Sequence, residues 1–254
     1  MNPTLDLSGK VAVVTGGSRG TGRAIAQGFA EAGADVVVAS RKLDSCEVAA
    51  KEIQQSTGRI ALPVGCHVAY WDQCDELVER TYAEFGRCDV LVNNAGMSPL
   101  YDRLTDITEA YYDKVHGVNL KGPFRLAVNF GARMADSTGG SIINIGTIGS
   151  LRPGASEIVY ACAKAGLNAL TIAIAEGYGP TVRSNAILPG AIMTDIAAGW
   201  SEERRQAAGA DTPLGRPGYP EDYVGPALWL ASDASAFVTG EVIRVDGGAY
   251  RQMP

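Results

Sequence analysis

Apolar and polar positions follow two different patterns along this chain. Short runs rich in valine, isoleucine and alanine predict strands at residues 11–15, 36–40, 60–65, 90–93, 141–145, 183–188 and 241–245. Longer stretches with apolar side chains three or four positions apart predict helices at residues 20–32, 44–56, 72–85, 109–135, 159–178 and 220–232. Because the strands are almost continuously apolar, they suit a parallel sheet that is covered on both faces.

The alternation of strands and helices predicts the α/β class, with a doubly wound, Rossmann-type parallel sheet of about seven strands and helices on both faces. No linker, repeat or low-complexity segment divides the chain, so we expect residues 1–254 to form a single domain. The least regular stretch, residues 191–217, begins just after a strand ends, where ligands of such sheets bind. We interpret this stretch as a substrate lid, with an ordinary surface excursion as the alternative.

Composition narrows the classes of partner. The net charge is −6 and no segment concentrates lysine and arginine, so a nucleic-acid or anionic-membrane partner is not expected. No apolar run is expected to approach the roughly 18–20 residues that span a bilayer, and the first ten residues show no secretory signal. The five cysteines form no C-x-x-C pair, and Cys66, His67 and Cys74 match no usual zinc spacing. We therefore expect a reduced, cytoplasmic protein without a metal site.

A glycine-rich turn at residues 15–22 joins the first predicted strand to the first helix. Its glycines let the backbone turn tightly and approach a pyrophosphate, and the helix N-terminus adds N–H donors and partial positive charge. The spacing is G-x-x-x-G-x-G rather than the commoner G-x-G-x-x-G, and such a turn alone could be structural. Its place in a strand–helix unit nevertheless predicts dinucleotide binding through Gly16, Ser18, Arg19, Gly20, Thr21 and Gly22.

The end of the second strand bears on which dinucleotide binds. An acidic residue there usually holds the ribose 2′-hydroxyl of NAD, but this strand ends in Ser40, Arg41 and Lys42. Together with Arg19, these groups suit a 2′-phosphate, which arginine grips with two hydrogen bonds. We expect NADP(H) to be preferred and NAD(H) to be a second option. The alternative is that the basic residues merely open a solvated loop.

Tyr160 and Lys164 are four residues apart at the start of a predicted helix, so they share a face. A cation beside a tyrosine, together with an oxidised nicotinamide, favours the phenolate and lowers the pKa of the phenol, as proton transfer at neutral pH requires. Such a pair arises easily by chance, and the alternative is a partly exposed tyrosine near a surface lysine. Its position after the fifth strand, in a chain that also carries the glycine turn, favours a catalytic pair.

With these motifs the chain resembles the short-chain dehydrogenase/reductase family over essentially its whole length. Residues 15–22 match its TGxxxGxG turn, residues 93–96 its NNAG motif, Tyr160 and Lys164 its YxxxK motif, and residues 238–241 and 245–248 its closing strand region. The resemblance implies that Tyr160 transfers the proton, that Lys164 lowers its pKa and binds the nicotinamide ribose, and that Asn119 completes a proton relay through water. It further implies cofactor contacts from Asn94, Ala95, Gly96, Pro189, Gly190, Ile192 and Thr194.

The chain departs from the family pattern at two positions. Thr147, thirteen residues before Tyr160, stands where the family has the serine that binds the substrate oxygen. Threonine keeps the hydroxyl, so we expect Thr147 to take this role, with Ser150 as its rival. His67 precedes Val68 where the family has an aspartate near the adenine amino group. A neutral imidazole could accept from that amino group or stack on the ring, or the backbone of Val68 could make the contact alone.

The resemblance implies an NADP(H)-dependent oxidoreductase that interconverts a carbonyl and a secondary alcohol. A catalytically weak, dinucleotide-binding regulatory protein is the alternative, and an epimerase or dehydratase is a further one. The expected partner is a small carbonyl or alcohol substrate, and the expected assembly is a homotetramer or homodimer. The substrate pocket is expected at residues 98–100, 149–154 and 191–217, apolar or mixed, with Arg152 in solvent or on an anion. Its predicted apolar lining is Leu100, Leu151, Ile158, Ile192, Ile196 and Trp200.

Overall fold

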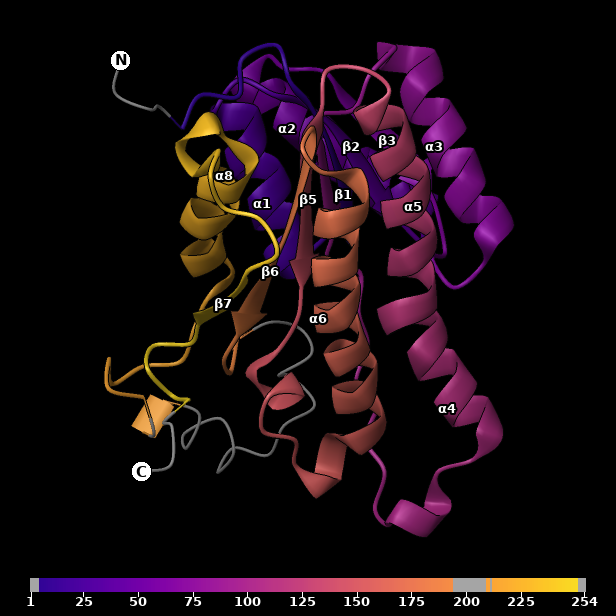
Figure 1. Cartoon of the computed structure of the whole chain (residues 1–254), viewed down its shortest axis with the longest axis vertical. Coiled ribbons are helices and arrows are strands. Elements are labelled where there is room, and N and C mark those ends of the chain that lie inside the picture. Colours follow the sequence, from indigo (N-terminus) through magenta and orange to yellow (C-terminus); the bar gives the residue numbers. More distant parts are fainter. Residues whose placement is uncertain (1–4, 194–208, 211, 251–254) are drawn as a thin grey trace.

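Seven parallel strands form one sheet at the centre of the molecule (Figure 1). The computed structural model describes residues 5–193, 209–210 and 212–250. The spatial order of the strands is β3-β2-β1-β4-β5-β6-β7, which confirms the predicted α/β class and doubly wound sheet. Their bounds are β1 (Val11–Thr15), β2 (Asp35–Ser40), β3 (Ala61–Gly65), β4 (Val90–Asn93), β5 (Gly140–Ile145), β6 (Val182–Pro189) and β7 (Val242–Val245).

Helices cover both faces of the sheet. They are α1 (Gly20–Glu31), α2 (Leu43–Thr57), α3 (Trp71–Phe85), α4 (Glu109–His116), α5 (Gly122–Ala135), α6 (Ile158–Tyr178) and α8 (Val224–Ala231). Short 3₁₀ turns are η1 (Leu104–Asp106), η3 (Ile148–Ser150), η4 (Ala155–Glu157), η6 (Pro220–Tyr223) and η7 (Asp233–Ser235). The predicted helix at 220–232 therefore begins as the 3₁₀ turn η6, because Pro220 starts a tight turn that Asp222 closes onto the backbone of Tyr219.

Two separate cores pack against the sheet, one on each face. In β1, Ala12 and Val14 join the core beneath α1, α2 and α8, whereas Val13 joins the core beneath α3, α5 and α6. Successive side chains of a strand point to opposite faces, so an apolar residue at every position is what a doubly covered strand needs. The nearly continuous apolar strands of the sequence are explained by these two cores.

The sheet order reverses between β1 and β4, which lie side by side although two strands and three helices separate them in the chain. Connections leave β1 toward one edge of the sheet and β4 toward the other, and the carboxyl ends of both strands face the same end of the molecule. In Figure 1 this is the lower end, toward which the arrows of β5 and β6 point. Ligands of doubly wound sheets bind at this position.

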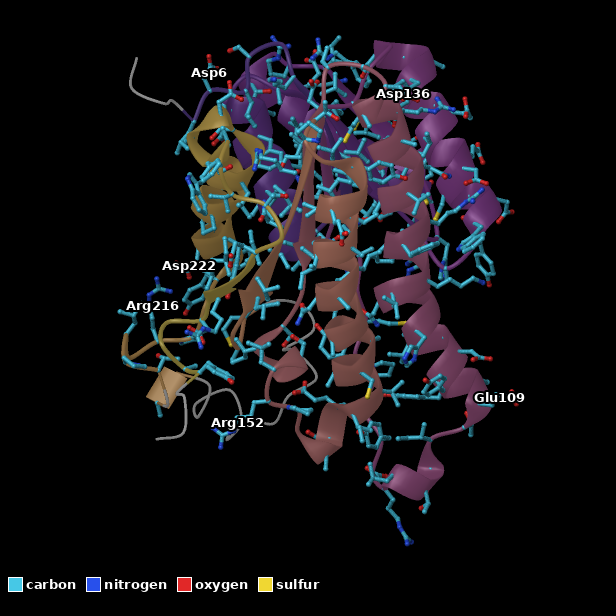
Figure 2. All side chains as sticks on the ribbon, viewed as in Figure 1. Asp6, Glu109, Asp136, Arg152, Arg216 and Asp222 are labelled. Atoms are coloured by element: carbon cyan, nitrogen blue, oxygen red, sulfur yellow. The ribbon has the colours of Figure 1, made fainter. Side chains whose placement is uncertain are left out.

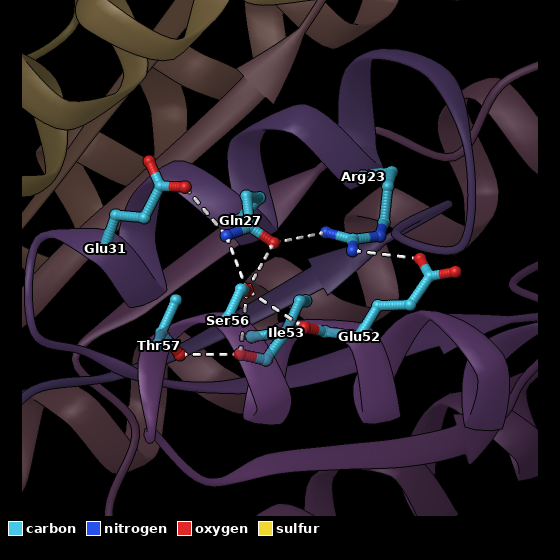
Figure 3. Close-up of polar contacts among 7 residues, drawn as sticks. All are labelled: Arg23, Gln27, Glu31, Glu52, Ile53, Ser56 and Thr57. Atoms are coloured by element: carbon cyan, nitrogen blue, oxygen red, sulfur yellow. Dashed lines mark hydrogen bonds and ion pairs between the residues drawn. The ribbon is translucent and has the colours of Figure 1, made fainter.

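Helices α1 and α2 are joined by polar contacts on their outer surfaces (Figure 3). Arg23 donates to Gln27 on its own helix at 3.0 Å and reaches Glu52 on α2 at 3.2 Å. Gln27 also donates to Ser56 of α2 at 3.0 Å. Such exposed pairs each contribute little to stability, but together they fix the spacing of the two helices that flank the glycine turn and the end of β2.

The predicted continuous helix at 109–135 is wrong in one respect. A π-helical turn, η2 (Gly117–Lys121), separates α4 from α5. Gly117 and Gly122 bound this turn, and a side chain at Gly122 would collide with the backbone oxygen of Val68. The π-helical turn therefore packs closely on the loop after β3. The 3.6-residue periodicity of the sequence does not reveal the presence of this turn.

Helix α6 is the longest helix that the structure describes, at 21 residues. An 18-residue window within residues 155–178 has a mean hydropathy of 1.6, so this stretch could span a membrane by length and composition alone, and the expectation that no apolar run approaches this length was wrong. The helix packs against β6 and α5 and contains the buried Lys164. Core helices of globular proteins have the same composition, but only 39% of the apolar window is buried, so much of its surface is uncovered.

Candidate active site

A cavity of about 800 Å³ opens at the carboxyl ends of the strands. The glycine turn, the ends of β2 to β6 and the start of α6 all contribute to its lining. The predicted cofactor residues among its lining residues are Gly16, Ser18, Arg19, Gly20, Thr21, Gly22, Ser40, Arg41, His67, Val68, Asn94, Ala95, Gly96, Tyr160, Lys164, Pro189, Gly190 and Ile192. The remaining predicted residue, Thr194, lies outside the described residues.

The glycine turn is tied to the end of β4 by Asn94. Its amide nitrogen donates to the backbone oxygens of Thr15 at 2.8 Å and Gly16 at 3.3 Å. Gly16 has φ +65°, and a Cβ on Gly16 or Gly22 would lie 2.7 or 2.3 Å from that nitrogen. Only glycine fits at both positions, and no side chain caps the first turn of α1. The resulting cradle of backbone beside a helix N-terminus fits the pyrophosphate of a dinucleotide.

The end of the cavity near β2 is cationic. Arg19, Arg41 and Lys42 line it together with the hydroxyl groups of Ser18, Ser40 and Ser45. Among the described residues that line the whole cavity, Glu157 is the single carboxylate, and it lies at the other end, beside Tyr160. Ser45, in the first turn of α2, was missed as a site residue. The signal available in the sequence was a hydroxyl at a helix start directly after the basic residues.

His67 is half-buried, and its ring is oriented by the local backbone. Its Nδ1 accepts from the amide of Ala69 at 3.3 Å, while its own amide donates to Gln73 at 2.8 Å. Burial, followed by the charge of Arg41, lowers the pKa of His67 below its ordinary value. The neutral ring therefore carries its proton on Nε2, which is a donor. The idea that the imidazole accepts from the adenine amino group does not fit this tautomer, whereas stacking and the backbone contact of Val68 remain open.

Tyr160 and Lys164 lie on the inner face of α6. Lys164 is 2% exposed, and its Nζ donates to the backbone oxygen of Ile145 at 2.6 Å and lies 5.9 Å from the centroid of the Tyr160 ring. Burial lowers the pKa of Lys164 to about 7. The amine is thus held by the backbone of Ile145 beside the Tyr160 ring, and the predicted action of its charge on the phenol stays a prediction.

The pKa of Tyr160 is raised above its ordinary value, whereas the predicted lowering applies to the complex with an oxidised nicotinamide and stays a prediction. The largest cause is burial, and the negative charge of Glu157 adds to it. A hydrogen bond with the hydroxyl of Thr147 acts in the opposite direction but is outweighed. In this arrangement the phenol is protonated at neutral pH and is suited to donate a proton.

Thr147 and Ser150 are clearly separated in space and in bonding. Thr147 lines the cavity, accepts from the amide of Gly149 at 3.1 Å and is hydrogen-bonded to Tyr160. Ser150 donates to the backbone oxygen of Thr147 at 2.6 Å and accepts from Asn168 at 2.9 Å, and it is not among the lining residues. The geometry therefore favours Thr147 over Ser150 as the substrate-binding hydroxyl.

Asn119 sits in the π-helical turn, fully buried behind the cavity wall. Its Oδ1 accepts from the amide of Met97 at 3.1 Å, and its Nδ2 donates to the backbone oxygens of Met97 at 2.8 Å and Val115 at 2.9 Å. A Cβ on Gly96 would lie 3.2 Å from Asn119 Oδ1 and 3.9 Å from Lys164 Nζ. Asn119 thus brings the segment after β4 close to Lys164 without lining the cavity itself.

The substrate end is lined by both apolar and polar residues, which fits the mixed pocket among the two predicted kinds. Ser98, Leu100 and Ile192 line it, but Leu151 and Ile158 are 43% and 40% exposed and are not among the lining residues. Arg152, Ser156 and Glu157 take part in the lining instead. Figure 2 shows Arg152 at the lower end of the molecule, the end that carries the cavity. Ile196 and Trp200 lie outside the described residues.

Comparisons with known proteins agree with this geometry. A family model described as enoyl-(acyl carrier protein) reductase matches residues 16–250. An L-rhamnose 1-dehydrogenase (NAD(P)(+)) of Azotobacter vinelandii is 39% identical over 248 residues, which cover 95% of this chain and 96% of the relative. The 3-oxoacyl-[acyl-carrier-protein] reductase FabG of Thermotoga maritima is 37% identical over 243 residues, with coverage of 95% and 98%.

A solved structure leads to the same family. The crystal structure of a short-chain type dehydrogenase/reductase from Mycobacterium marinum superimposes with a TM-score of 0.93 at 34% identity and covers 98% of each chain. Its likeness extends over the sheet, the helices and the connections that form the cavity, since almost the whole chain is matched. The protein therefore belongs to the short-chain dehydrogenase/reductase family of oxidoreductases.

Proposed function

We propose that the protein is an NADP(H)-dependent oxidoreductase that interconverts a carbonyl group and a secondary alcohol, with Tyr160 as general acid and base. The observation that carries this proposal is the meeting of Tyr160, Thr147 and Lys164 at one wall of the cavity that the glycine turn also lines. The alternative of a catalytically weak regulatory protein has no such support, because the tyrosine and the lysine are both present and both line the cavity.

The roles of the side chains follow from their places. The bound dinucleotide supplies or takes up the hydride. Thr147 binds the substrate oxygen, and Tyr160 donates a proton to that oxygen in reduction or removes one in oxidation. Burial and the charge of Glu157 raise the pKa of the phenol, which favours the protonated form that donates in reduction. Lys164 holds the nicotinamide ribose, and Asn119 keeps the adjoining backbone in place and holds the relay water.

The cationic end of the cavity supports the preference for NADP(H). A 2′-phosphate carries two negative charges near neutral pH, and Arg19, Arg41 and Lys42 line that end without an opposing carboxylate among the lining residues. NAD(H), which lacks the phosphate, would leave these cations without their anionic partner. It remains a usable second cofactor because the glycine cradle binds the pyrophosphate that both dinucleotides share.

The outer face of α6 supports assembly into a homodimer or homotetramer. Its exposed residues in the middle of the helix, over 162–173, are Cys162, Ala165, Ala169, Ile172 and Ala173, all apolar and mostly small. A monomer would present polar groups at such positions, whereas small apolar residues allow a second helix to approach closely. Exposed Tyr112 of α4 and Phe124 of α5 extend the apolar surface on the neighbouring helices. We propose that copies of this chain meet across α4, α5 and α6.

Other features of the proposed protein rest on the sequence. These are a single dinucleotide-binding and catalytic domain over residues 1–254, a substrate lid at 191–217, a small carbonyl or alcohol substrate and a cytoplasmic location. The lid falls largely outside the described residues. Its described flanks fit the proposal, since Ala191 and Ile192 line the cavity.

A carbonyl-substrate screen that follows NADPH absorbance tests the proposed function. We expect turnover of at least one ketone or aldehyde, with kcat/KM at least about tenfold higher for NADPH than for NADH, because the 2′-phosphate gains charge-assisted hydrogen bonds. Equal or reversed efficiency would refute the cofactor preference. Cofactor binding without turnover across ketones, aldehydes, sugars and thioesters would favour the regulatory alternative.

A further inference from the structure

One acidic side chain belongs to the substrate end of the cavity and does not itself carry the transferred proton. Glu157 closes the 3₁₀ turn η4 and immediately precedes α6, three residues before Tyr160. It is half-buried and is the single carboxylate among the described residues that line the cavity. Residues three apart at a helix start lie on one side, so the carboxylate stands over the same space as the phenol.

Gly149 shows where the carboxylate points. A Cβ built on this glycine would lie 2.6 Å from Glu157 Oε1 and 3.4 Å from Thr147 Oγ1. The two oxygens therefore flank one point, and Thr147 is itself hydrogen-bonded to Tyr160. The charge of Glu157 is also felt by the phenol. Glu157, Thr147 and Tyr160 consequently form one polar wall where a substrate oxygen would be held.

The chemistry of this wall restricts what fits against it. An ionised carboxylate only accepts hydrogen bonds, but it has about four acceptor sites and can serve a ligand in addition to a protein group. Its place before the first turn of α6 favours the ionised form, because helix N-termini carry partial positive charge. A purely apolar substrate would displace water from the carboxylate without replacing the lost hydrogen bonds, whereas a substrate hydroxyl would donate a hydrogen bond to it.

We propose that Glu157 selects substrates that carry a hydroxyl group on the carbon next to the reacting one. Such compounds are α-hydroxy ketones and aldehydes and the corresponding vicinal diols, the functional pattern of sugars and polyols. Thr147 and Tyr160 hold the reacting oxygen, and the neighbouring hydroxyl donates to Glu157. This inference rests on the proposed function, and it deepens that function by naming the substrate class.

Two matched compounds that differ by one hydroxyl test the inference. The ratio of kcat/KM for 2-hydroxycyclohexanone to that for cyclohexanone is measured with NADPH at fixed pH. Both ketones use the same Tyr160, so any general effect of a substitution on the phenol cancels in this ratio. We expect the wild-type ratio to be roughly 10 to 100, the value of a hydrogen bond to a charged group.

Four variants locate the origin of this ratio. Glu157→Leu should bring it to about 1, and Glu157→Gln, which keeps an acceptor but not the charge, should fall between. Gly149→Ala keeps the charge, but its added methyl displaces the flexible carboxylate and should also lower the ratio. Glu176→Gln is the matched control, because it removes the same charge from the exposed far end of α6 and should leave the ratio unchanged.

A binding measurement separates this inference from the proposed function. Both diastereomers of 1,2-cyclohexanediol and, for comparison, cyclohexanol are titrated into the NADPH-loaded protein, and cofactor fluorescence reports binding without turnover. Tighter binding of a diol that disappears in Glu157→Leu supports the inference, even if neither ketone is reduced, in which case only the proposed reaction fails. Equal binding of diol and alcohol, or a preference that survives in Glu157→Leu, overturns the role of Glu157 while leaving the reaction intact.

Discussion

The two ends of the cavity differ in their charge and in the segments that supply their residues. The cofactor end presents Arg19, Arg41 and Lys42, and its residues come from a few positions after β1 and β2. The substrate end presents Glu157 and Arg152, which have opposite charges, with the hydroxyls of Thr147 and Tyr160, and its described residues come from several separate segments. In the proposed function, the excess of positive charge would direct a polyanionic dinucleotide to the cofactor end and leave the other end for a neutral, hydroxylated substrate.

Substitution of Tyr160, the proposed proton donor, should have the largest effect, because it should lower turnover while leaving cofactor binding nearly unchanged. Tyr160→Phe removes only the phenol oxygen, and general acid catalysis contributes about a hundred- to ten-thousandfold, so turnover should fall by about a thousandfold. The cofactor end is untouched, and the Kd for NADPH, read by fluorescence, should change less than about threefold if cofactor contacts lie mainly there. Retained turnover would place the acid elsewhere and end the proposed mechanism.

Substitution of Thr147, which carries the second hydroxyl, should have the next largest effect on kcat. Thr147→Ala removes the donor to the substrate oxygen and should lower kcat about a hundredfold, whereas Thr147→Ser should remain within a few-fold of wild type. Ser150→Ala is the matched control, since Ser150 bonds to Thr147 and Asn168 outside the cavity lining. Steady-state kinetics on one substrate decide the point, and an unimpaired Thr147→Ala would transfer the role to Ser150.

At the cofactor end, Arg41→Ala should lower the ratio of kcat/KM for NADPH over NADH by about 10- to 100-fold. The loss should come from NADPH, because NADH has no phosphate for the guanidinium to bind. Lys51→Ala, which removes an exposed cation elsewhere on α2, serves as control and should leave the ratio alone. An unchanged ratio in Arg41→Ala would show that the cationic end does not select the cofactor.

The smallest predicted effect is a change in the pH dependence of kcat caused by the charge of Glu157. Glu157 raises the pKa of Tyr160, so Glu157→Gln should lower it. Alcohol oxidation needs the phenolate, and its rate should therefore rise at a lower pH in the variant; carbonyl reduction needs the phenol and should also decline at a lower pH. Profiles of kcat against pH in both directions measure this, with Glu176→Gln as control. A shift to higher pH would contradict the assigned sign.

The two ends also differ in how far the sequence foretells them. The strands and the glycine turn were predictable, because continuous apolar runs and glycine spacing express local requirements. Glu157 was missed as a site residue, since an acid before a helix is usually read as favouring the helix N-terminus. Leu151 and Ile158 were expected in the pocket because hydrophobicity does not say which way a loop residue faces. Opposing effects of burial and charge on Tyr160 likewise depend on the folded arrangement.

The π-helical turn at Gly117–Lys121 changes the directions in which the side chains of α5 point around the helix axis relative to those of α4. A turn with a wider period rotates everything after it around the helix axis relative to everything before it. The side chains of α4 and α5 therefore obey two different helical phases, although they form one nearly continuous rod. This phase change lets α5 keep its apolar stripe on the sheet and its Arg125 on Asp75 of α3, while Asn119 turns toward the segment after β4. A residue inserted or deleted within this rod is not equivalent to one in a surface loop, because it would reset one phase against the other.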